Sequence, residues 1–263
     1  MPASSNQEKF VRAIASLWNR ERLMLSQSAA DPESLAHYLT AFKRMHPQTL
    51  ASLKTTPSGL HYLEAVFSYS RFLSEEVIQH PDWIESLAHC SSMHRQLSAE
   101  ELQSSFRAFP EANRYAAFRR RQLLRILIRD VLGYGTLSGI TEELSDLADC
   151  ILHFAYQEIR RQLAGRFGAP RYLNRDRVDE DCAFSVIALG KLGGRELNFS
   201  SDIDLMFVYA GNGVTDGVES ISNKEFFHKS RTCIPASSLP IRRAAVYRVD
   251  LNCARMVMRL FVA

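Results

Sequence analysis

Apolar positions in the first two thirds of the chain recur with helical spacing. A stripe near the amino terminus predicts an amphipathic helix; it consists of Phe10, Ile14 and Leu17. Asp31 followed by Pro32 predicts the start of a second helix, because aspartate caps exposed amides and proline suits the first helical turn. A further apolar stretch covers residues 62–78 and ends at His80. These patterns predict a helical region that extends to about residue 165.

The clearest helical pattern lies in two segments, residues 118–131 and 140–163, separated by a glycine-containing break at 133–135. Thr141 and Ser145, near the start of the second segment, offer hydroxyl groups to exposed amides. The first segment carries the nearest approach to a basic cluster in the chain, and i, i+4 spacing favours a solvated helix face for it. That cluster consists of Arg119, Arg120, Arg121, Arg125 and Arg129.

The pattern changes after Gly165. Residues 166–181 are rich in glycine, proline, asparagine and charge, which is typical of a linker or loop. Residues 184–189 are a short apolar run typical of a buried strand, and residues 202–209 begin with period-2 alternation, which predicts a second strand. We therefore expect an α+β chain, with a helical region over 1–165 and a small strand-containing domain over 166–263.

Composition and charge exclude several classes of protein. Thirty-two basic and 29 acidic side chains give a net charge of +3, too weak and too dispersed to indicate nucleic-acid binding. The five cysteines form no Cys-x-x-Cys pair, so neither a disulfide framework nor a zinc site is indicated. No stretch approaches the roughly 20 apolar residues of a membrane span, and the amino terminus lacks an apolar signal region. We expect a cytoplasmic protein that binds no membrane.

The candidate chemistry lies at Asp202 and Asp204. Residues i and i+2 of a strand project from the same face, so these carboxylates point together while Ile203 and Leu205 point into a core. Two adjacent carboxylates repel each other unless a cation lies between them, and hard oxygen ligands suit Mg²⁺. A lone Asp-x-Asp is also a common surface pair that binds nothing. The preceding strand and glycine pair make the combination more specific for a nucleotidyltransferase site.

The segment between the two predicted strands supplies candidate phosphate-binding residues. Adjacent glycines let the backbone approach a phosphate closely, and serine hydroxyls and amides add donors just ahead of the carboxylates. The candidates are Lys191, Gly193, Gly194, Ser200 and Ser201.

This segment resembles a known family. Gly190-Lys-Leu-Gly-Gly-Arg-Glu-Leu-Asn-Phe-Ser-Ser-Asp-Ile-Asp204 is similar to the signature of the glutamine synthetase adenylyltransferases, which belong to the DNA polymerase β-like nucleotidyltransferase superfamily. Residues 119–133 and 141–149 also resemble the amino-terminal half of that family, and residues 80–83 resemble it more weakly. Together these matches span about residues 80–209.

The resemblance implies a substrate and a division of labour. Family members hold two nucleotidyltransferase domains: the amino-terminal one removes AMP from a tyrosine of glutamine synthetase by phosphorolysis, giving ADP, and the carboxy-terminal one attaches AMP from ATP. This chain would hold the removing site, with Asp202 and Asp204 as metal ligands. Adenylylated glutamine synthetase, phosphate and ADP/ATP are the implied partners, and the PII signal protein and glutamine are the implied regulators of the enzyme. The implied role is regulation of glutamine synthetase in nitrogen assimilation.

The superfamily also places a third carboxylate on a later strand. Residues 247–251 match the family there, which makes Asp250 the candidate third metal ligand. An ordinary edge strand with a solvent-facing aspartate explains the same residues.

After Leu251 the sequence departs from the family, which continues with Leu-Arg-Pro-Asp-Gly. Codons compatible with residues 252–257 can encode that string in the neighbouring frame, so we expect a truncated domain that is frame-shifted after 251; a natural divergent end is the alternative. Pro235 and Pro240 are expected to break a family helix over residues 230–243. A domain altered in this way is expected to show little activity on its own.

Two other functions stay open from the sequence. One is a different metal-dependent nucleotidyltransferase, such as one that modifies the PII protein. The other is a non-catalytic helical interaction module. Binding of Mg²⁺-nucleotide and release of AMP from modified glutamine synthetase distinguish the three.

Overall fold

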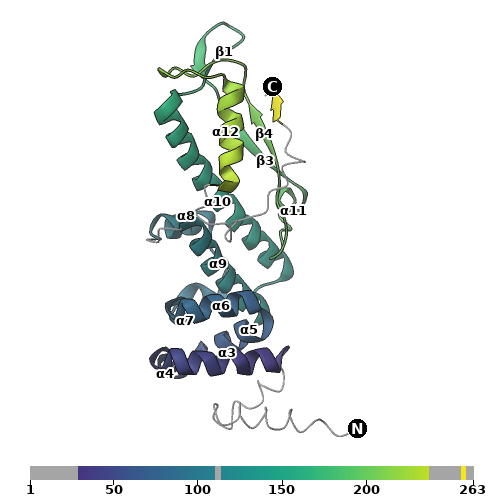
Figure 1. Ribbon diagram of the computed structural model, residues 1–263. Coiled ribbons are helices and arrows are strands. Elements are labelled where there is room, and N and C mark those ends of the chain that lie inside the picture. The colour runs from purple at the N-terminus through teal and green to yellow at the C-terminus, as the bar shows by residue number, and fades with distance from the viewer. Residues whose placement is uncertain (1–28, 110–113, 237–255, 259–263) are drawn as a thin grey trace. The chain divides into compact units, whose positions relative to one another are not determined.

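The computed structural model describes residues 29–109, 114–236 and 256–258 (Figure 1). Its long helices come first along the chain and its strands follow, which confirms the expected fold class. The chain forms two compact units, Met1–Gln96 with Arg120–Ile140, and Leu97–Arg119 with Thr141–Ala263. The predicted division into 1–165 and 166–263 stays a prediction. The apolar stripe at Phe10, Ile14 and Leu17 lies outside the described residues.

The first unit is helical throughout its described part. The predicted start at Asp31 is confirmed, because its carboxylate accepts a hydrogen bond from the Ser34 amide at 3.0 Å and Pro32 occupies the first turn. The elements are α3 (Pro32–Met45), α4 (Pro47–Thr55), α5 (Gly59–Tyr69), α6 (Arg71–Gln79), α7 (Pro81–Ala88), the 3₁₀ helix η2 (Ser91–His94) and the later part of α9 (Arg114–Val131).

The apolar stretch over residues 62–78 forms two helices where the sequence suggests one. Ser70 has an extended backbone, with φ −145°, and separates α5 from α6. Its hydroxyl accepts a hydrogen bond from the Leu73 amide at 3.2 Å, so it caps the second helix. Apolar periodicity continues across the break, which is why the pattern hides it.

The prediction of a solvated arginine face on α9 is wrong for two of its five members. Arg125 and Arg129 are each only 3% exposed. Arg125 donates to the carbonyl oxygens of Ser92 and Arg95, and Arg129 donates from Nε to the carbonyl oxygen of Met93 at 3.1 Å. A buried guanidinium needs such acceptors, and the irregular backbone around η2 provides them.

The second unit contains every strand that the structure describes. β3 (Phe184–Leu189) pairs antiparallel with β4 (Asp204–Tyr209), and β4 pairs parallel with β5 (Met256–Met258). Residues 166–181 are not a plain linker, because they form a hairpin of β1 (Arg171–Leu173) and β2 (Asp179–Asp181). The helices of this unit are α8 (Ala99–Arg107), the start of α9, most of α10 (Leu137–Phe167), the short α11 (Gly190–Gly193) and α12 (Asn223–Ala236).

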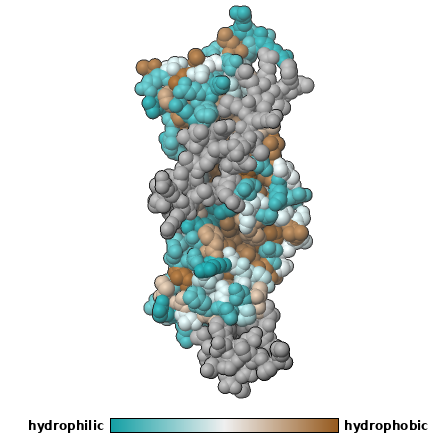
Figure 2. Space-filling view, turned by 45° about the vertical axis from the view of Figure 1, so that its right-hand side comes forward, coloured by the Kyte–Doolittle hydropathy of each residue, from teal (hydrophilic) through white to brown (hydrophobic). Residues whose placement is uncertain are grey.

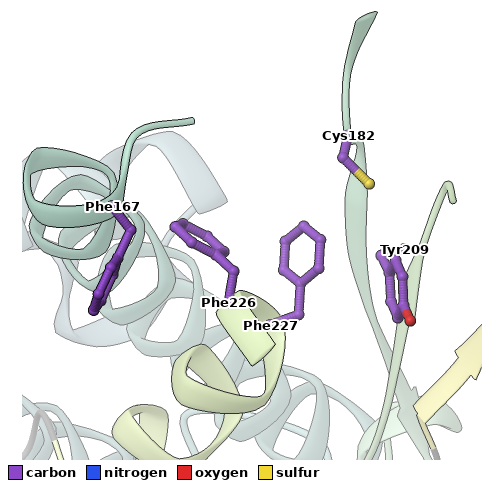
Figure 3. Packing of buried hydrophobic residues seen from close by; sticks show 5 residues of the cluster. All are labelled: Phe167, Cys182, Tyr209, Phe226 and Phe227. Carbon is purple, nitrogen blue, oxygen red and sulfur yellow. The ribbon is translucent and has the colours of Figure 1, made fainter. Parts of the chain in front are cut away.

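An aromatic core fixes the β3–β4 pair against α10 and α12. Phe167 at the end of α10 and Phe226 and Phe227 of α12 face Cys182 and Tyr209, which lie on the strand side (Figure 3). The Phe227 ring stacks on Phe184 of β3 with centroids 4.7 Å apart. This core lies at the Phe184–Tyr209 end of the strand pair, so the opposite end is left for the candidate site.

β4 is the buried strand of the pair and β3 is its partly exposed neighbour. Leu205, Phe207, Val208 and Tyr209 are buried, whereas no residue of β3 is fully buried. The sequence therefore predicts the strand at 184–189 correctly but overestimates its burial. In the described sheet β3 is an edge strand with one paired neighbour, and β4 is paired on both sides.

The helix over residues 223–236 continues through Pro235 and ends one residue later. Pro240 lies outside the described residues, as do residues 247–251. Apolar side chains reach the surface in both units (Figure 2). Within the described ranges, every helix is too short or too polar to cross a lipid bilayer.

Candidate functional site

The end of β3 and the start of β4 meet at one edge of the sheet. The two strands are neighbours, as the sequence predicts, and their register places Leu189 opposite Asp204. Asp202 lies two residues before β4. Because the strands are antiparallel, the connector of residues 190–203 folds over this edge, and the candidate residues that the structure describes all lie in it or at its end.

Burial alternates at the start of β4 as expected from the sequence. Ile203 and Leu205 are completely buried, with 0% exposure. Asp204 is half-buried and Asp202 is exposed. Side chains alternate between the two faces of a strand, so Asp204 lies on the face away from Leu205, and Asp202 is an exposed residue just before the strand.

The carboxylate of Asp204 lies against Gly190. Gly190 has a φ of +55°, and a Cβ atom built there would lie 2.7 Å from Oδ2 of Asp204. The backbone conformation strains any residue other than glycine, and a side chain at this position would displace the Asp204 carboxylate. Sequence reasoning singled out Gly193 and Gly194 and missed Gly190. The sequence feature that could have identified Gly190 is its position directly after β3, the strand that pairs with the strand beginning at Asp204.

The two adjacent glycines of the connector have different surroundings. A Cβ at Gly193 would lie 2.6 Å from the carbonyl oxygen of Ala188, so this glycine lets α11 pack closely on β3. A Cβ at Gly194 would meet nothing nearer than 3.5 Å. Packing explains Gly193, whereas Gly194 leaves an exposed stretch of backbone that a ligand can approach.

Asn198 organises the serines that precede the aspartates. Its Oδ1 atom accepts hydrogen bonds from the Ser200 amide at 3.1 Å and from the Ser201 hydroxyl at 2.7 Å. Nζ of Lys191 donates to the same hydroxyl oxygen at 3.5 Å. The connector thus brings Lys191 and Ser201, ten residues apart, beside each other. Asn198 is a second residue that sequence reasoning missed, although asparagine commonly forms such turns.

The described donors fit a hard divalent cation. Asp202 and Asp204 provide carboxylate oxygens, and oxygen ligands of this kind suit Mg²⁺. Because Gly190 has no side chain, the Asp204 carboxylate can occupy the space beside it, where the Cβ atom of a larger residue would lie. Asp250, the expected third carboxylate, lies outside the described residues. Among the residues that the structure describes, no three His, Cys, Asp or Glu side chains gather into a metal-binding group.

Comparison with known proteins gives the family of the chain. The family model described as glutamate-ammonia ligase adenylyltransferase matches residues 60–253. A bifunctional glutamine synthetase adenylyltransferase/adenylyl-removing enzyme from Shewanella loihica is 32% identical over 84% of this chain and 24% of its own length. A protein of the same name from Aromatoleum aromaticum is 32% identical over 88% of this chain and 25% of its own.

A shorter match has a higher identity. The protein of that name from Alteromonas mediterranea is 39% identical over 51% of this chain and 13% of its own length. The chain spans about a quarter of the length of the first two relatives. The family match contains the whole connector and both described aspartates, and the chain therefore belongs to the glutamate-ammonia ligase adenylyltransferase family.

Proposed function

We propose that the connector and the two aspartates form a nucleotidyltransferase site of the adenylyl-removing type. The reaction is phosphorolysis of the AMP group on a tyrosine of glutamine synthetase. The observation that carries the proposal is the contact between Gly190 and Asp204, because it joins the glycine-containing connector and the carboxylate pair into one local structure. The names of the relatives, which include both adenylyltransferase and adenylyl-removing activities, support the substrate.

The chemistry is a displacement at the phosphorus of AMP. An oxygen of inorganic phosphate forms a bond to that phosphorus, and the bond from the phosphorus to the tyrosine oxygen breaks. The products are ADP and the tyrosine, whose oxygen takes up the proton that phosphate gives up. Charge builds up on the phosphoryl oxygens, so catalysis depends on positioning and on compensation of negative charge.

Each described residue has a part in this scheme. Asp202 and Asp204 would hold Mg²⁺, which supplies charge neutralisation at the phosphoryl group. Lys191 and Ser201 form a cationic and a hydroxyl donor beside each other, suited to phosphate oxygens. The exposed backbone at Gly194 lets a phosphate approach the main chain. Asp250 remains the proposed third carboxylate.

Removal of AMP is proposed over attachment because residues 80–209 resemble the amino-terminal half of the family. Control by PII and glutamine, and a role in nitrogen assimilation, are proposed from the same resemblance. The alternative reaction is attachment of AMP from ATP. The two reactions are distinguished by the nucleotide that the chain prefers, ADP for removal and ATP for attachment.

Binding of ADP to the purified chain tests the proposal. We expect calorimetry to show ADP binding that requires Mg²⁺, and we expect Asp202→Asn and Asp204→Asn each to weaken it at least tenfold. Asp176→Asn is the matched control, because Asp176 is an exposed aspartate on the β1–β2 hairpin. A wild-type chain that binds ATP with Mg²⁺ but not ADP would favour attachment. Equal binding by wild type and both aspartate variants would refute the site.

A further inference from the structure

The connector is held by two adjacent residues of α10. Oδ1 of Asp146 accepts a hydrogen bond from Nη2 of Arg195 at 2.7 Å, which is also an ion pair. The hydroxyl oxygen of Ser145 accepts from the Leu197 amide at 3.3 Å. These contacts join segments that are 49 and 52 residues apart in sequence. All four residues belong to the second unit.

Arg195 occupies an unusual backbone conformation at the turn after α11. Its φ is +58°, in the left-handed region that non-glycine residues rarely adopt. The turn is closed by hydrogen bonds from the Arg195 amide to Leu192 and from the Glu196 amide to Lys191, at 3.1 and 2.7 Å. A residue keeps a strained backbone conformation only when the surrounding structure stabilises it. The ion pair with Asp146 provides such stabilisation for Arg195.

Ser145 contributes through a fully buried hydroxyl. Its side chain is 0% exposed, and the hydroxyl donates to the carbonyl oxygen of Thr141 at 2.8 Å while accepting from Leu197. Leu197 is itself 1% exposed. Removal of the Ser145 hydroxyl would leave the Leu197 amide buried without this acceptor. An unsatisfied buried amide is unfavourable, because it loses its hydrogen bond without gaining one to water.

The charges around Arg195 favour the same arrangement. Asp149 lies about one helical turn after Asp146 on α10. The pKa of the Asp149 carboxyl is raised mainly by burial and also by the negative charge of Asp146, whereas the positive charge of Arg195 lowers it. Hydrogen bonding to Asp146 raises the pKa of the Arg195 guanidinium, and Asp149 and Glu142 add to this effect. Arg195 is therefore a cation that this acidic stretch of α10 faces, and its guanidinium is in contact with the Asp146 carboxylate.

We infer that Ser145 and Asp146 are positioning residues for the nucleotide site. They fix the middle of the connector, so that Lys191 and Gly194 on one side and Ser201 and Asp202 on the other face one ligand. The inference rests on the proposed function for the nature of that ligand. The anchoring of the connector by α10 does not depend on it, and the two can be tested separately.

The test measures ADP affinity and backbone opening in the full chain. We expect Asp146→Ala and Ser145→Ala each to weaken Mg²⁺-dependent ADP binding about 5- to 20-fold. Asp146→Glu should recover most of the loss. Hydrogen exchange at the Leu197 amide should accelerate at least tenfold in Ser145→Ala. Gln157→Ala, an exposed position on the same helix, is the control and should change neither quantity.

A double-substitution cycle tests whether Asp146 acts through Arg195. If it does, Asp146→Ala, Arg195→Ala and the double variant should lose ADP affinity by similar factors. Thermal unfolding of the Asp146 variants should stay close to wild type, since the Arg195 side chain is half exposed and the pair adds little to global stability. Wild-type ADP affinity in both Ser145→Ala and Asp146→Ala, or additive losses in the cycle, would overturn the inference.

The hydrogen-exchange arm separates this inference from the proposed function. If the wild-type chain binds no ADP, the proposed function fails, and exchange at Leu197 alone then decides the anchoring. Faster exchange in Ser145→Ala supports the anchoring by α10 in that case, and unchanged exchange refutes it.

Discussion

Gly190 and Asp204 are in contact, so a side chain at position 190 and the Asp204 carboxylate in its present place exclude each other. The backbone of Gly190 is left-handed, and Oδ2 of Asp204 occupies the space in which any other residue would place its Cβ atom. The glycine that follows β3 and the aspartate that begins β4 thus form one feature at the sheet edge, although the whole connector separates them in sequence.

This contact predicts the effect of a single methyl group. Gly190→Ala forces the Asp204 carboxylate aside and strains the backbone, so we expect Mg²⁺-dependent ADP binding to fall at least tenfold. Gly165→Ala is the matched control: Gly165 lies within α10, no atom lies within 4 Å of the place that a methyl group would take, and alanine is the better helix former. Calorimetric titration of both variants checks this. Unchanged ADP affinity in Gly190→Ala would contradict the role given to the contact.

The adjacent pair Gly193 and Gly194 provides a stability test with a built-in comparison. A methyl group at Gly193 would press on the carbonyl oxygen of Ala188, so we expect Gly193→Ala to destabilise the chain by about 1–3 kcal/mol. A Cβ at Gly194 would make only ordinary van der Waals contacts, so Gly194→Ala is expected to change stability by less than about 0.5 kcal/mol. Urea unfolding of the two variants measures the difference. Equal destabilisation would show that the packing of α11 on β3 is not as described.

The strands and the carboxylate pair could be predicted because short-range patterns determine them. The apolar run over residues 184–189 is too short for a typical helix, and Asp202–Leu205 alternate with the period of a strand. Both strands are present at those positions or within two residues of them. The helix start at Asp31 follows from an equally local signal.

The remaining features depend on contacts between distant segments. Arg125 and Arg129 have the spacing of a solvated face, yet they are buried because the backbone in and around η2, about 30 residues earlier, presents carbonyl groups to them. The need for glycine at position 190 depends on the register that brings Asp204 opposite the end of β3. Neither the partner nor the register is encoded in the neighbouring residues, so local patterns could not give them.

The buried arginines predict a large difference between two residues of one helix. Arg129→Met removes a buried guanidinium and leaves the carbonyl oxygens of Met93 and Tyr134 without their donor. We expect a loss of about 2–4 kcal/mol in the free energy of unfolding. Arg121→Met is the comparison: Arg121 is only partly buried and donates one hydrogen bond to the Ser86 hydroxyl, so its loss should stay below about 1 kcal/mol. Similar losses in chemical denaturation would contradict the structural role of Arg129.

Glu64 on α5 predicts a pH dependence of stability. Burial raises the pKa of its carboxyl to about 7. Between the ordinary carboxyl range and about pH 7, the folded chain holds a proton that the unfolded chain has released, so stability falls as pH rises through this window. Glu64→Gln removes the charge, and we expect it to be about 1–2 kcal/mol more stable than wild type at about pH 8. The advantage should vanish near about pH 4 in unfolding experiments. A constant difference between the two pH values would show that Glu64 does not titrate in this way.

The central claim, that Asp202 and Asp204 belong to an AMP-removing site, is tested most directly in a complete relative. In the Shewanella loihica enzyme, the residues that align with Asp202 and Asp204 are replaced by asparagine. Release of ADP from adenylylated glutamine synthetase with phosphate and Mg²⁺ is then measured beside attachment of AMP from ATP. We expect the release of ADP to fall at least about 100-fold while attachment stays within about twofold of wild type, because each site holds its own metal ligands. Retained release, or equal loss of both activities in a folded enzyme, would contradict the account.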